Sequence, residues 1–378
     1  MTFRKASKLD GIEISLIRQW NAKAKPNTIK MTIGELPYEP PRAVIDAGIK
    51  AFAEKRMTYT SNAGLAELRK LVALEHEENT GRKTNENNVI ITNGVEQALY
   101  NTFSTFLNPG DNVLIPEIFF SPYETIPRMN GANVNKFALK EDFSIDLKDL
   151  ESKLNDRTKL VVINSPANPT GNVLGSEELL ELAEILKKHP DVYVASDEIY
   201  SHLFFCEKMP DSISKYFDRS IVMNGISKRA SATGLRIGWT IAPEEVTKEM
   251  LKVQQYTVTC ASTPCQYAAI PVLRGQCVQE EKSYRDMLRE NRDLTTKLIR
   301  EIPGTLINNP EGAFYCFPDI SQYGSSEKVS QRLLDEADVL VIPGIAFGLR
   351  GDNHVRISYA VEHSKLEEGL NRIKGVLK

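Results

Sequence analysis

Short runs of consecutive apolar residues recur along much of the chain, and stretches with helical periodicity separate most of them. Runs of four or so apolar residues are typical of strands that are buried on both faces. Strand and helix alternation of this kind predicts a largely parallel sheet with helices on both faces, an α/β fold. The five runs lie at 89–92, 113–115, 160–163, 192–195 and 221–223.

Helical patterns account for most of the remaining chain. The longest, 266–302, predicts a helix that crosses between two lobes, and we expect Pro271 and Gly275 to break or kink its early part. Two lobes are also what 378 residues favour, because one simple core rarely grows that large. Further helices are predicted at 12–20, 41–55, 65–78, 98–106, 176–188, 244–255, 329–337 and 365–377, and further strands at 30–33, near 310–315, at 339–342 and at 354–360.

Polar or aromatic residues follow the ends of the predicted parallel strands. Because ligands of such sheets bind beyond the carboxyl ends of the strands, we expect these residues to converge on one crevice. Each taken alone is equally consistent with a turn, a cap or core packing. Their convergence is what favours a functional site, and the residues are Gly94, Phe120, Asn168, Asp197 and Lys228.

The stretch 220–240 contains the most suggestive chemistry. Lys228 lies among small residues after an apolar run and an Asn-Gly turn, and Arg236 follows eight positions later. A lysine amine can form a Schiff base with a carbonyl compound, and an arginine can hold a phosphate bidentately. A carbonyl and a phosphate occur together on pyridoxal 5'-phosphate (PLP). A surface lysine and a surface arginine would give the same local pattern.

Three more positions have both a structural and a functional interpretation. Gly34 is a turn glycine or a point of close backbone approach to a ligand. Tyr59 lies in a predicted loop, where a single tyrosine is normally a packing residue. Arg356 stands inside an apolar strand, and a buried guanidinium needs an anionic partner, either a structural carboxylate or that of a substrate.

Composition excludes several classes of function. The chain has 47 Lys+Arg against 50 Asp+Glu, a formal net charge of −3, so no basic field for nucleic acid is present. The five scattered cysteines form no C-x-x-C pair, and neither a disulfide framework nor a metal site is indicated. No signal peptide or membrane-spanning run is evident. We therefore expect a cytoplasmic protein that has no membrane or nucleic-acid partner.

Taken together, the motifs resemble those of class I (aspartate aminotransferase-like) aminotransferases of the PLP fold type I superfamily, nearly from end to end. The order of Asn-Pro-Thr-Gly and Ser-Lys…Thr-Gly-x-Arg-x-Gly is the most specific part of the resemblance. The matching segments are Gly34-Glu35, Tyr59-Thr60, Ala63-Gly64, Thr92-Asn93-Gly94, Asn108-Pro109-Gly110-Asp111, 164–171, Asp197-Glu198-Ile199-Tyr200, Ser227-Lys228, Ala232-Thr233-Gly234, Arg236-Ile237-Gly238 and Val355-Arg356-Ile357-Ser358.

The resemblance implies an architecture. It is a large domain with a mostly parallel seven-stranded sheet sandwiched by helices, plus a smaller α+β domain. The implied boundaries are 46–285 for the large, PLP-binding domain, and 1–45 with 286–378 for a discontinuous small domain.

The resemblance also implies a ping-pong transfer of an amino group from an L-amino acid to a 2-oxo acid through a Lys228 Schiff base with PLP. The Lys228 amine would move the proton, and Asp197 would pair with the pyridine nitrogen and keep the ring an electron sink. Tyr200 and Asn168 would bond the phenolate oxygen of the ring, and Phe120 would stack on it.

Phosphate and substrate contacts are carried over in the same way. Arg356 would bind the substrate α-carboxylate near the Gly34 backbone. The tyrosine at position 59 reaches the phosphate of the neighbouring subunit in this family, which implies a homodimer with shared active sites. The implied phosphate ligands are Gly94, Val95, Glu96, Ser227 and Arg236.

Some positions depart from the usual family pattern and leave specificity and reaction type open. Gly225 stands where relatives often have a phosphate-binding serine, and Arg229 follows the lysine where relatives have a smaller or neutral residue. No second arginine for a dicarboxylate is evident, and Phe120 replaces the tryptophan of aspartate-specific members, which tilts the prediction toward neutral or aromatic amino acids. A PLP-dependent C–S β-lyase on the same fold is the alternative. A non-catalytic PLP-binding sensor is less favoured, because we expect no DNA-binding domain before the family pattern.

Overall fold

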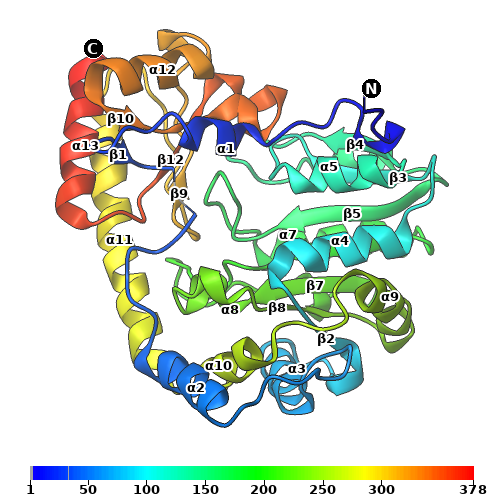
Figure 1. Ribbon diagram of the computed structural model, residues 1–378. Coiled ribbons are helices and arrows are strands. Elements are labelled where there is room, and N and C mark those ends of the chain that lie inside the picture. Colours follow the sequence, from blue (N-terminus) through cyan, green and yellow to red (C-terminus); the bar gives the residue numbers. More distant parts are fainter. Residues whose placement is uncertain (1–2, 33) are drawn as a thin grey trace.

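A seven-stranded sheet forms the centre of the computed structural model, which describes residues 3–32 and 34–378 (Figure 1). The strand order is β2-β8-β7-β6-β5-β3-β4, and only β8 runs antiparallel to its neighbours. The fold is therefore the predicted α/β class with a mostly parallel sheet. Its strands are β2 (Val89–Thr92), β3 (Asn112–Pro116), β4 (Asn133–Phe137), β5 (Thr158–Asn164), β6 (Tyr193–Asp197), β7 (Ser220–Gly225) and β8 (Gly238–Ile241).

Helices cover both faces of this sheet, because the strands are apolar on both sides. The core on one face lies under α4 (Gly94–Phe106), α5 (Pro122–Met129) and α9 (Glu244–Thr257). The other face is covered by the helices α2 (Arg42–Ala53), α3 (Ala66–Thr80), α6 (Leu147–Lys153), α7 (Ser176–Lys187) and α10 (Thr263–Leu273).

A second lobe lies at the upper left of Figure 1 and contains two small sheets. One pairs β1 (Ile29–Lys30) with β10 (Val339–Leu340), and the other has the order β11-β12-β9. The remaining elements here are α1 (Leu16–Asn21), β9 (Tyr315–Cys316), α12 (Ser326–Ala337), β11 (Ile342–Pro343), β12 (Val355–Ser358) and α13 (His363–Val376).

The helix α11 (Val278–Arg300) joins the two parts of the molecule and is the yellow helix on the left of Figure 1. The predicted long helix over 266–302 is two helices, α10 and α11. The chain breaks at 274–277, where Gly275 has φ +70°, while Pro271 stays inside α10. The expected break is confirmed, and its position is set by the left-handed glycine.

Several predicted elements differ in extent. The strand expected at 30–33 is β1, which covers Ile29–Lys30, and residue 33 lies outside the described residues. The run at 339–342 splits into β10 and β11, which belong to different sheets. The N-terminal helix starts at Leu16 rather than at Ile12. The strands β4 and β8 were not predicted.

No helix in the described part of the chain is long and apolar enough to cross a membrane.

Candidate active site

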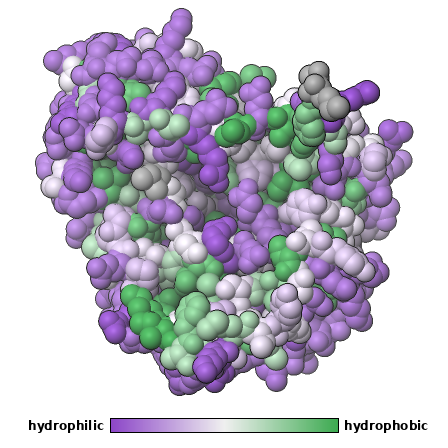
Figure 2. Space-filling view, in the orientation of Figure 1, coloured by the Kyte–Doolittle hydropathy of each residue, from purple (hydrophilic) through white to green (hydrophobic). Residues whose placement is uncertain are grey.

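A cavity of about 1010 Å³ lies where the carboxyl ends of the central strands face the second lobe. Figure 2 shows the surface hollowed between that lobe and the rest of the molecule. The register explains the convergence, since Asn164 pairs with Asp197 and Asp197 with Met223, so neighbouring strands end at one level. The predicted residues that line the cavity are Gly34, Val95, Glu96, Phe120, Asn168, Asp197, Tyr200, Ser227, Lys228, Arg236 and Arg356.

Lys228 comes from α8 (Ile226–Arg229), a single turn that directly follows β7. Its side chain is partly buried, and Nζ donates a hydrogen bond to the carbonyl oxygen of Gly34 in the second lobe. Burial lowers the pKa of Lys228 to about 8; the charge of Glu35 opposes this shift, and Arg236 adds to it. An amine that loses its proton near neutral pH can act as both nucleophile and base.

Asp197 ends β6 and is only 4% exposed. Its Oδ2 accepts a hydrogen bond from the hydroxyl of Tyr123 at 2.7 Å, and Oδ1 accepts one from the Ile199 N–H at 3.2 Å. Burial raises the pKa of Asp197 to about 6, against the effect of the Tyr123 bond. None of the described ion pairs includes this carboxylate, so it suits a cationic group brought in by a ligand.

Arg356 lies on β12, is 2% exposed, and faces the same cavity. One Nη donates to the Asn168 side-chain oxygen at 2.9 Å and the other to the Thr32 carbonyl at 2.8 Å. Its Nε has no partner, and no described carboxylate pairs with it. Burial lowers the pKa of Arg356, because the charged guanidinium is removed from water without an anion beside it. An incoming carboxylate would stabilise this charge.

Tyr200 follows Asp197 by three residues, and its hydroxyl lies 3.2 Å from the hydroxyl of Tyr315 on β9. Burial raises the pKa of Tyr200 well above its usual range, so the hydroxyl stays protonated and can donate. Tyr315 also limits the space at Gly34, where a Cβ would lie 2.9 Å from the Tyr315 oxygen. Tyr315 has no predicted role, because its position in a strand does not reveal which hydroxyl it faces.

The N-terminus of α4 forms a tight backbone corner next to Arg236. A Cβ at Gly94 would lie 2.6 Å from Arg236 Nη2, and a Cβ at Gly238 would lie 2.9 Å from the Val95 nitrogen. Gly94 has φ +73°, and Arg236 also adopts the left-handed region at φ +55°. Gly94 is buried behind the lining rather than part of it. Free N–H groups at a helix N-terminus beside a guanidinium suit a phosphate.

Steric crowding explains why position 225 is a glycine. A Cβ there would lie 2.7 Å from the Ile237 carbonyl oxygen and 2.9 Å from the Gly238 Cα. The serine expected from the family pattern would therefore need the β7–β8 pair to move.

Phe120 lies at the cavity, as predicted, whereas Tyr59 lies outside it in this chain. Phe120 lines the cavity before α5, with its ring edge-on to Tyr123 at 5.8 Å between centroids. Tyr59 is 84% exposed and does not line the cavity of this chain.

The N-terminal segment contributes a wall that the sequence did not predict. Glu13, Ile14, Ile17 and Arg18 line the cavity from α1 and the residues before it. A short hydrogen bond of 2.5 Å, which Thr32 donates to the side-chain oxygen of Asn21, holds the segment in place. A signal was present in the helical spacing of Leu16 and Trp20, but spacing does not say what a helix faces.

Comparisons with known proteins agree with this geometry. A family model described as aminotransferase class I and II matches residues 26–373. The chain is 36% identical to an aspartate aminotransferase of Pyrococcus horikoshii, over 97% of this chain and 95% of that one. It is 35% identical to aromatic-amino-acid aminotransferase 2 of Thermococcus litoralis, over 93% and 92% of the two chains.

The solved structures agree as well. An aspartate aminotransferase from Thermus thermophilus with maleate superposes with a TM-score of 0.95 at 32% identity, over 100% of both chains. Relatives named as aminotransferases favour transamination over the β-lyase and the sensor considered above. This chain is an aminotransferase and belongs to the class I and II aminotransferase family, whose members use PLP.

Proposed function

We propose that the cavity binds PLP and moves an amino group from an L-amino acid to a 2-oxo acid by a ping-pong route. One observation carries the proposal: an amine with a lowered pKa lines the same cavity as a buried carboxylate that has no cationic partner, and a buried guanidinium that has no anionic partner, among the described residues. These are Lys228, Asp197 and Arg356. PLP with an amino acid supplies the missing partners, a ring nitrogen that can be protonated and an α-carboxylate.

The residues present fit this cofactor. Asp197, which accepts a hydrogen bond from Tyr123, would pair with the pyridine nitrogen, and Tyr200 with Asn168 would bond the phenolate oxygen. Phe120 would stack on the ring. When bound, PLP supplies an electron sink for the substrate's Cα electron pair. The N–H groups of Gly94, Val95 and Glu96, together with Ser227 and Arg236, would hold the phosphate.

The chain's own residues divide the remaining work. Arg356 holds the α-carboxylate, with the Gly34 backbone close by, so that the substrate Cα–H is oriented toward Lys228. The Lys228 amine takes the Cα proton and returns a proton on the cofactor side, which its lowered pKa favours at neutral pH. Tyr200 keeps its proton and donates a hydrogen bond throughout.

A second copy of the chain completes the site. Exposed apolar side chains gather on and after α2, and Figure 2 shows hydrophobic residues at the lower left, where α2 lies. A monomer rarely leaves such a patch exposed. Tyr59, within the same patch, reaches the phosphate of the neighbouring subunit. The exposed residues are Ile49, Phe52, Met57 and Tyr59.

The donor is an amino acid with an uncharged side chain, neutral or aromatic. Glu13, Glu35 and Glu96 face the cavity, and Arg18 is the one lining cation not already assigned to phosphate, carboxylate or catalysis. This balance of charges disfavours a second carboxylate on the donor. The two relatives named above differ in donor, so family membership alone does not decide the point.

The visible spectrum of the PLP-loaded protein, recorded against a panel of amino acids without an oxo acid, tests the proposal. We expect neutral and aromatic donors to convert the cofactor stoichiometrically to pyridoxamine phosphate, with one oxo acid released per site. Lys228→Ala should bind the cofactor but lack the visible absorption band that depends on Lys228. Amino acids should not convert its cofactor on the time scale of the wild-type reaction. Catalytic release of ammonia with an unchanged band would contradict transamination, and preferential conversion by aspartate would contradict the donor class.

A further inference from the structure

A buried charged cluster lies directly behind the catalytic lysine. It contains Arg229, Glu75, Glu281 and His202, here called the Arg229 cluster. Arg229 is 7% exposed, and its Nη1 lies 2.6 Å from Glu75 Oε2 while its Nε lies 2.8 Å from Glu281 Oε1. His202 Nε2 is 3.6 Å from Glu75 Oε1, and its Nδ1 is 4.0 Å from Glu281 Oε2. One guanidinium thus bridges two carboxylates.

The two carboxylates belong to different helices, and both form ion pairs with Arg229. Glu75 lies on α3 in the large lobe, and Glu281 lies in the first turn of α11. Burial alone would raise the pKa of Glu75, yet the nearby His202 and the charge of Arg229 lower it to about 2. Breaking the bridge would leave an unpaired charge inside the protein, so the geometry is strongly held.

The helix that carries Lys228 cannot hold its own position. It has four residues, and single turns are not stable without tertiary contacts. Lys228 and Arg229 are adjacent, so they point in different directions, one into the cavity and the other toward α3 and α11. The Arg229 bridge therefore anchors the backbone of Lys228 from the rear.

The same bridge fixes the start of α11, whose far end belongs to the second lobe. There the Asn291 side chain donates hydrogen bonds of 2.9 Å to the carbonyls of Tyr359 and Val361. Tyr359 directly follows β12, which carries Arg356. A chain of contacts thus runs from Arg229 through α11 to the segment that follows the strand of the carboxylate-binding arginine.

We propose that Arg229 is a positioning residue, and that its bridge to Glu281 sets the distance between the Lys228 amine and Arg356 across the two lobes. The inference rests on the proposed function, in which these two groups act on one amino acid. Arg229 itself does not touch the cavity. Arg229 sets the angle between α8 and α11, and this angle decides how well one amino acid reaches both Lys228 and Arg356.

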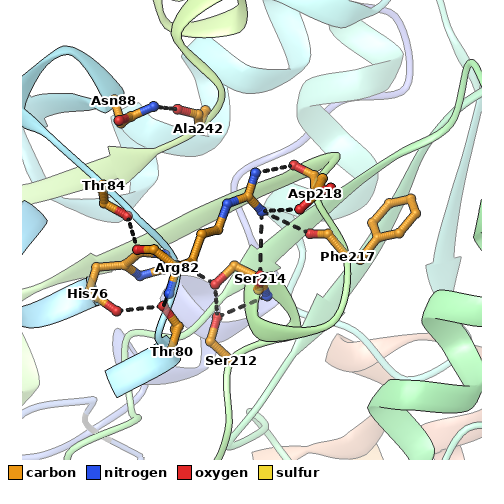
Figure 3. A network of polar contacts seen from close by, with 10 residues as sticks. All are labelled: His76, Thr80, Arg82, Thr84, Asn88, Ser212, Ser214, Phe217, Asp218 and Ala242. Atoms are coloured by element: carbon orange, nitrogen blue, oxygen red, sulfur yellow. Dashed lines mark hydrogen bonds and ion pairs between the residues drawn. The ribbon is translucent and has the colours of Figure 1, made fainter. Parts of the chain in front are cut away.

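A matched arginine elsewhere in the large lobe serves as the control. Arg82 donates to the carbonyls of Ser214, Phe217 and Asp218 at 3.4, 3.2 and 2.9 Å, as Figure 3 shows. Its network includes no contact to Lys228, α8 or α11 among the described residues. Arg82 therefore ties parts of one lobe together without linking the two lobes.

The test compares Arg229→Lys with Arg82→Lys. A lysine keeps the charge but cannot bridge two carboxylates in a fixed fork. In the loaded enzyme, Arg229→Lys should lower kcat/KM for the amino-acid donor on the order of 10- to 100-fold through displacement of reacting groups. Turnover of a primary amine without a carboxylate uses Lys228 but not Arg356, so it should fall much less than turnover of the amino acid. Arg82→Lys should change neither.

A second readout does not depend on the cofactor. Hydrogen–deuterium exchange of the PLP-free protein should increase in 226–229 and in the first turns of α11 for Arg229→Lys. For Arg82→Lys the increase should appear around 212–218 instead. A failure of the proposed function would remove amino-acid turnover from all variants but leave this exchange pattern intact, so the two hypotheses fail separately.

Two outcomes would overturn the positioning role. In one, Arg229→Lys slows the amino acid and the simple amine equally. In the other, exchange rises throughout the large lobe with no preference for α8 and α11. If Arg229→Lys folds poorly, Glu281→Gln supplies the same test, because it keeps the shape of the bridge and weakens it; unchanged donor kinetics in a folded Glu281→Gln would also contradict the proposal.

Discussion

The two sides of the cavity are built differently. The large-lobe side takes Asp197 from the end of β6 and Lys228 from α8, directly after β7; these strands have five and six residues within a seven-stranded sheet. The second-lobe side takes Arg356 from a three-stranded sheet in which β9 and β11 have two residues each. Gly34 and α1 add an irregular wall to that side.

Under the proposed function, this difference separates chemistry from recognition. The groups proposed to move protons and hold the cofactor stand on the part with the most strand pairing, where positions are best determined. The groups proposed to recognise the substrate stand on a smaller part joined through α11, where a shift of one lobe relative to the other changes their distance from the lysine. The predictions below test whether the two sides fail in these two different ways.

The largest effect is expected from Lys228→Ala on the large-lobe side. Loss of the amine removes both nucleophile and proton carrier, so the half-reaction should slow by about 10⁴-fold or more. Single-turnover mixing of loaded enzyme with donor measures it. The residues proposed to hold the phosphate are unchanged in this variant, so cofactor binding should remain. Lys153→Ala, which removes an ion pair to Asp149 far from the cavity, is the control and should react at the normal rate.

A smaller and different loss is expected from Arg356→Gln on the second-lobe side. Removing one partner of a buried charge pair costs about 2–4 kcal/mol, or roughly 30- to 700-fold in kcat/KM. The loss should appear mainly as a raised KM for the donor. Arg292→Gln removes another partly buried arginine of this lobe that bonds the Pro310 carbonyl, and it should leave KM unaffected. A fall in kcat alone would assign Arg356 to chemistry and erase the distinction between the two sides.

Sequence patterns predicted the central sheet well where strands are buried on both faces. The five apolar runs are β2, β3, β5, β6 and β7. The sequence patterns did not predict β4, an edge strand with the sequence Asn-Val-Asn-Lys-Phe, because a strand that is solvated on one side has no continuous run of apolar residues. They also missed β8, a glycine-started strand of four residues directly after the lysine loop.

The candidate site could be predicted where one residue breaks a local rule. An arginine inside an apolar strand pointed to Arg356, and a lysine among small residues after a strand pointed to Lys228. Contacts between distant segments carry no such signal. Tyr123 and Asp197 are 74 positions apart, and Arg229 and Glu75 are 154 apart, so neither pair is visible before the chain is folded.

A third prediction concerns the cofactor-free protein and Asp197→Asn. The folded-state pKa of Asp197, about 6, lies above the unfolded value of 3.8, so burial of the charge destabilises the fold as pH rises through this range. Asp197→Asn should therefore raise the free energy of unfolding of the PLP-free protein by on the order of 2–3 kcal/mol at pH 7. Near pH 4 it should leave this free energy unchanged. Denaturant unfolding at both pH values measures it.

Binding of PLP should reverse that sign, because the ring nitrogen supplies the missing cation. The control is Glu198→Gln at the adjacent position, where the carboxylate accepts bonds from Ser196 and Ser212 at 2.8 Å. Burial raises the pKa of Glu198 to about 7, so this variant should also gain stability with pH. Its gain should persist with PLP bound. The same response to PLP in both variants would exclude Asp197 as the partner of the ring nitrogen.

The smallest effect is expected from Tyr123→Phe. The Tyr123 hydroxyl donates to Asp197 at 2.7 Å and holds the pKa of that carboxyl down against burial. Without it, the pKa of Asp197 should rise and the acid limb of the kcat/KM profile should move to higher pH. The rate at neutral pH should fall roughly tenfold, as for a hydrogen bond of ~1.5 kcal/mol to a charged group.

Tyr193→Phe is the matched control for this variant, since Tyr193 lies on β6, the strand that ends at Asp197, and packs against Phe106 at 4.9 Å between ring centroids. It should leave the acid limb in place. Donor KM should be unchanged in both variants, because neither hydroxyl belongs to the second-lobe side. A Tyr123→Phe enzyme with a raised KM and an unmoved acid limb would mean that the large-lobe side also recognises substrate, and the division between chemistry and recognition would then be wrong.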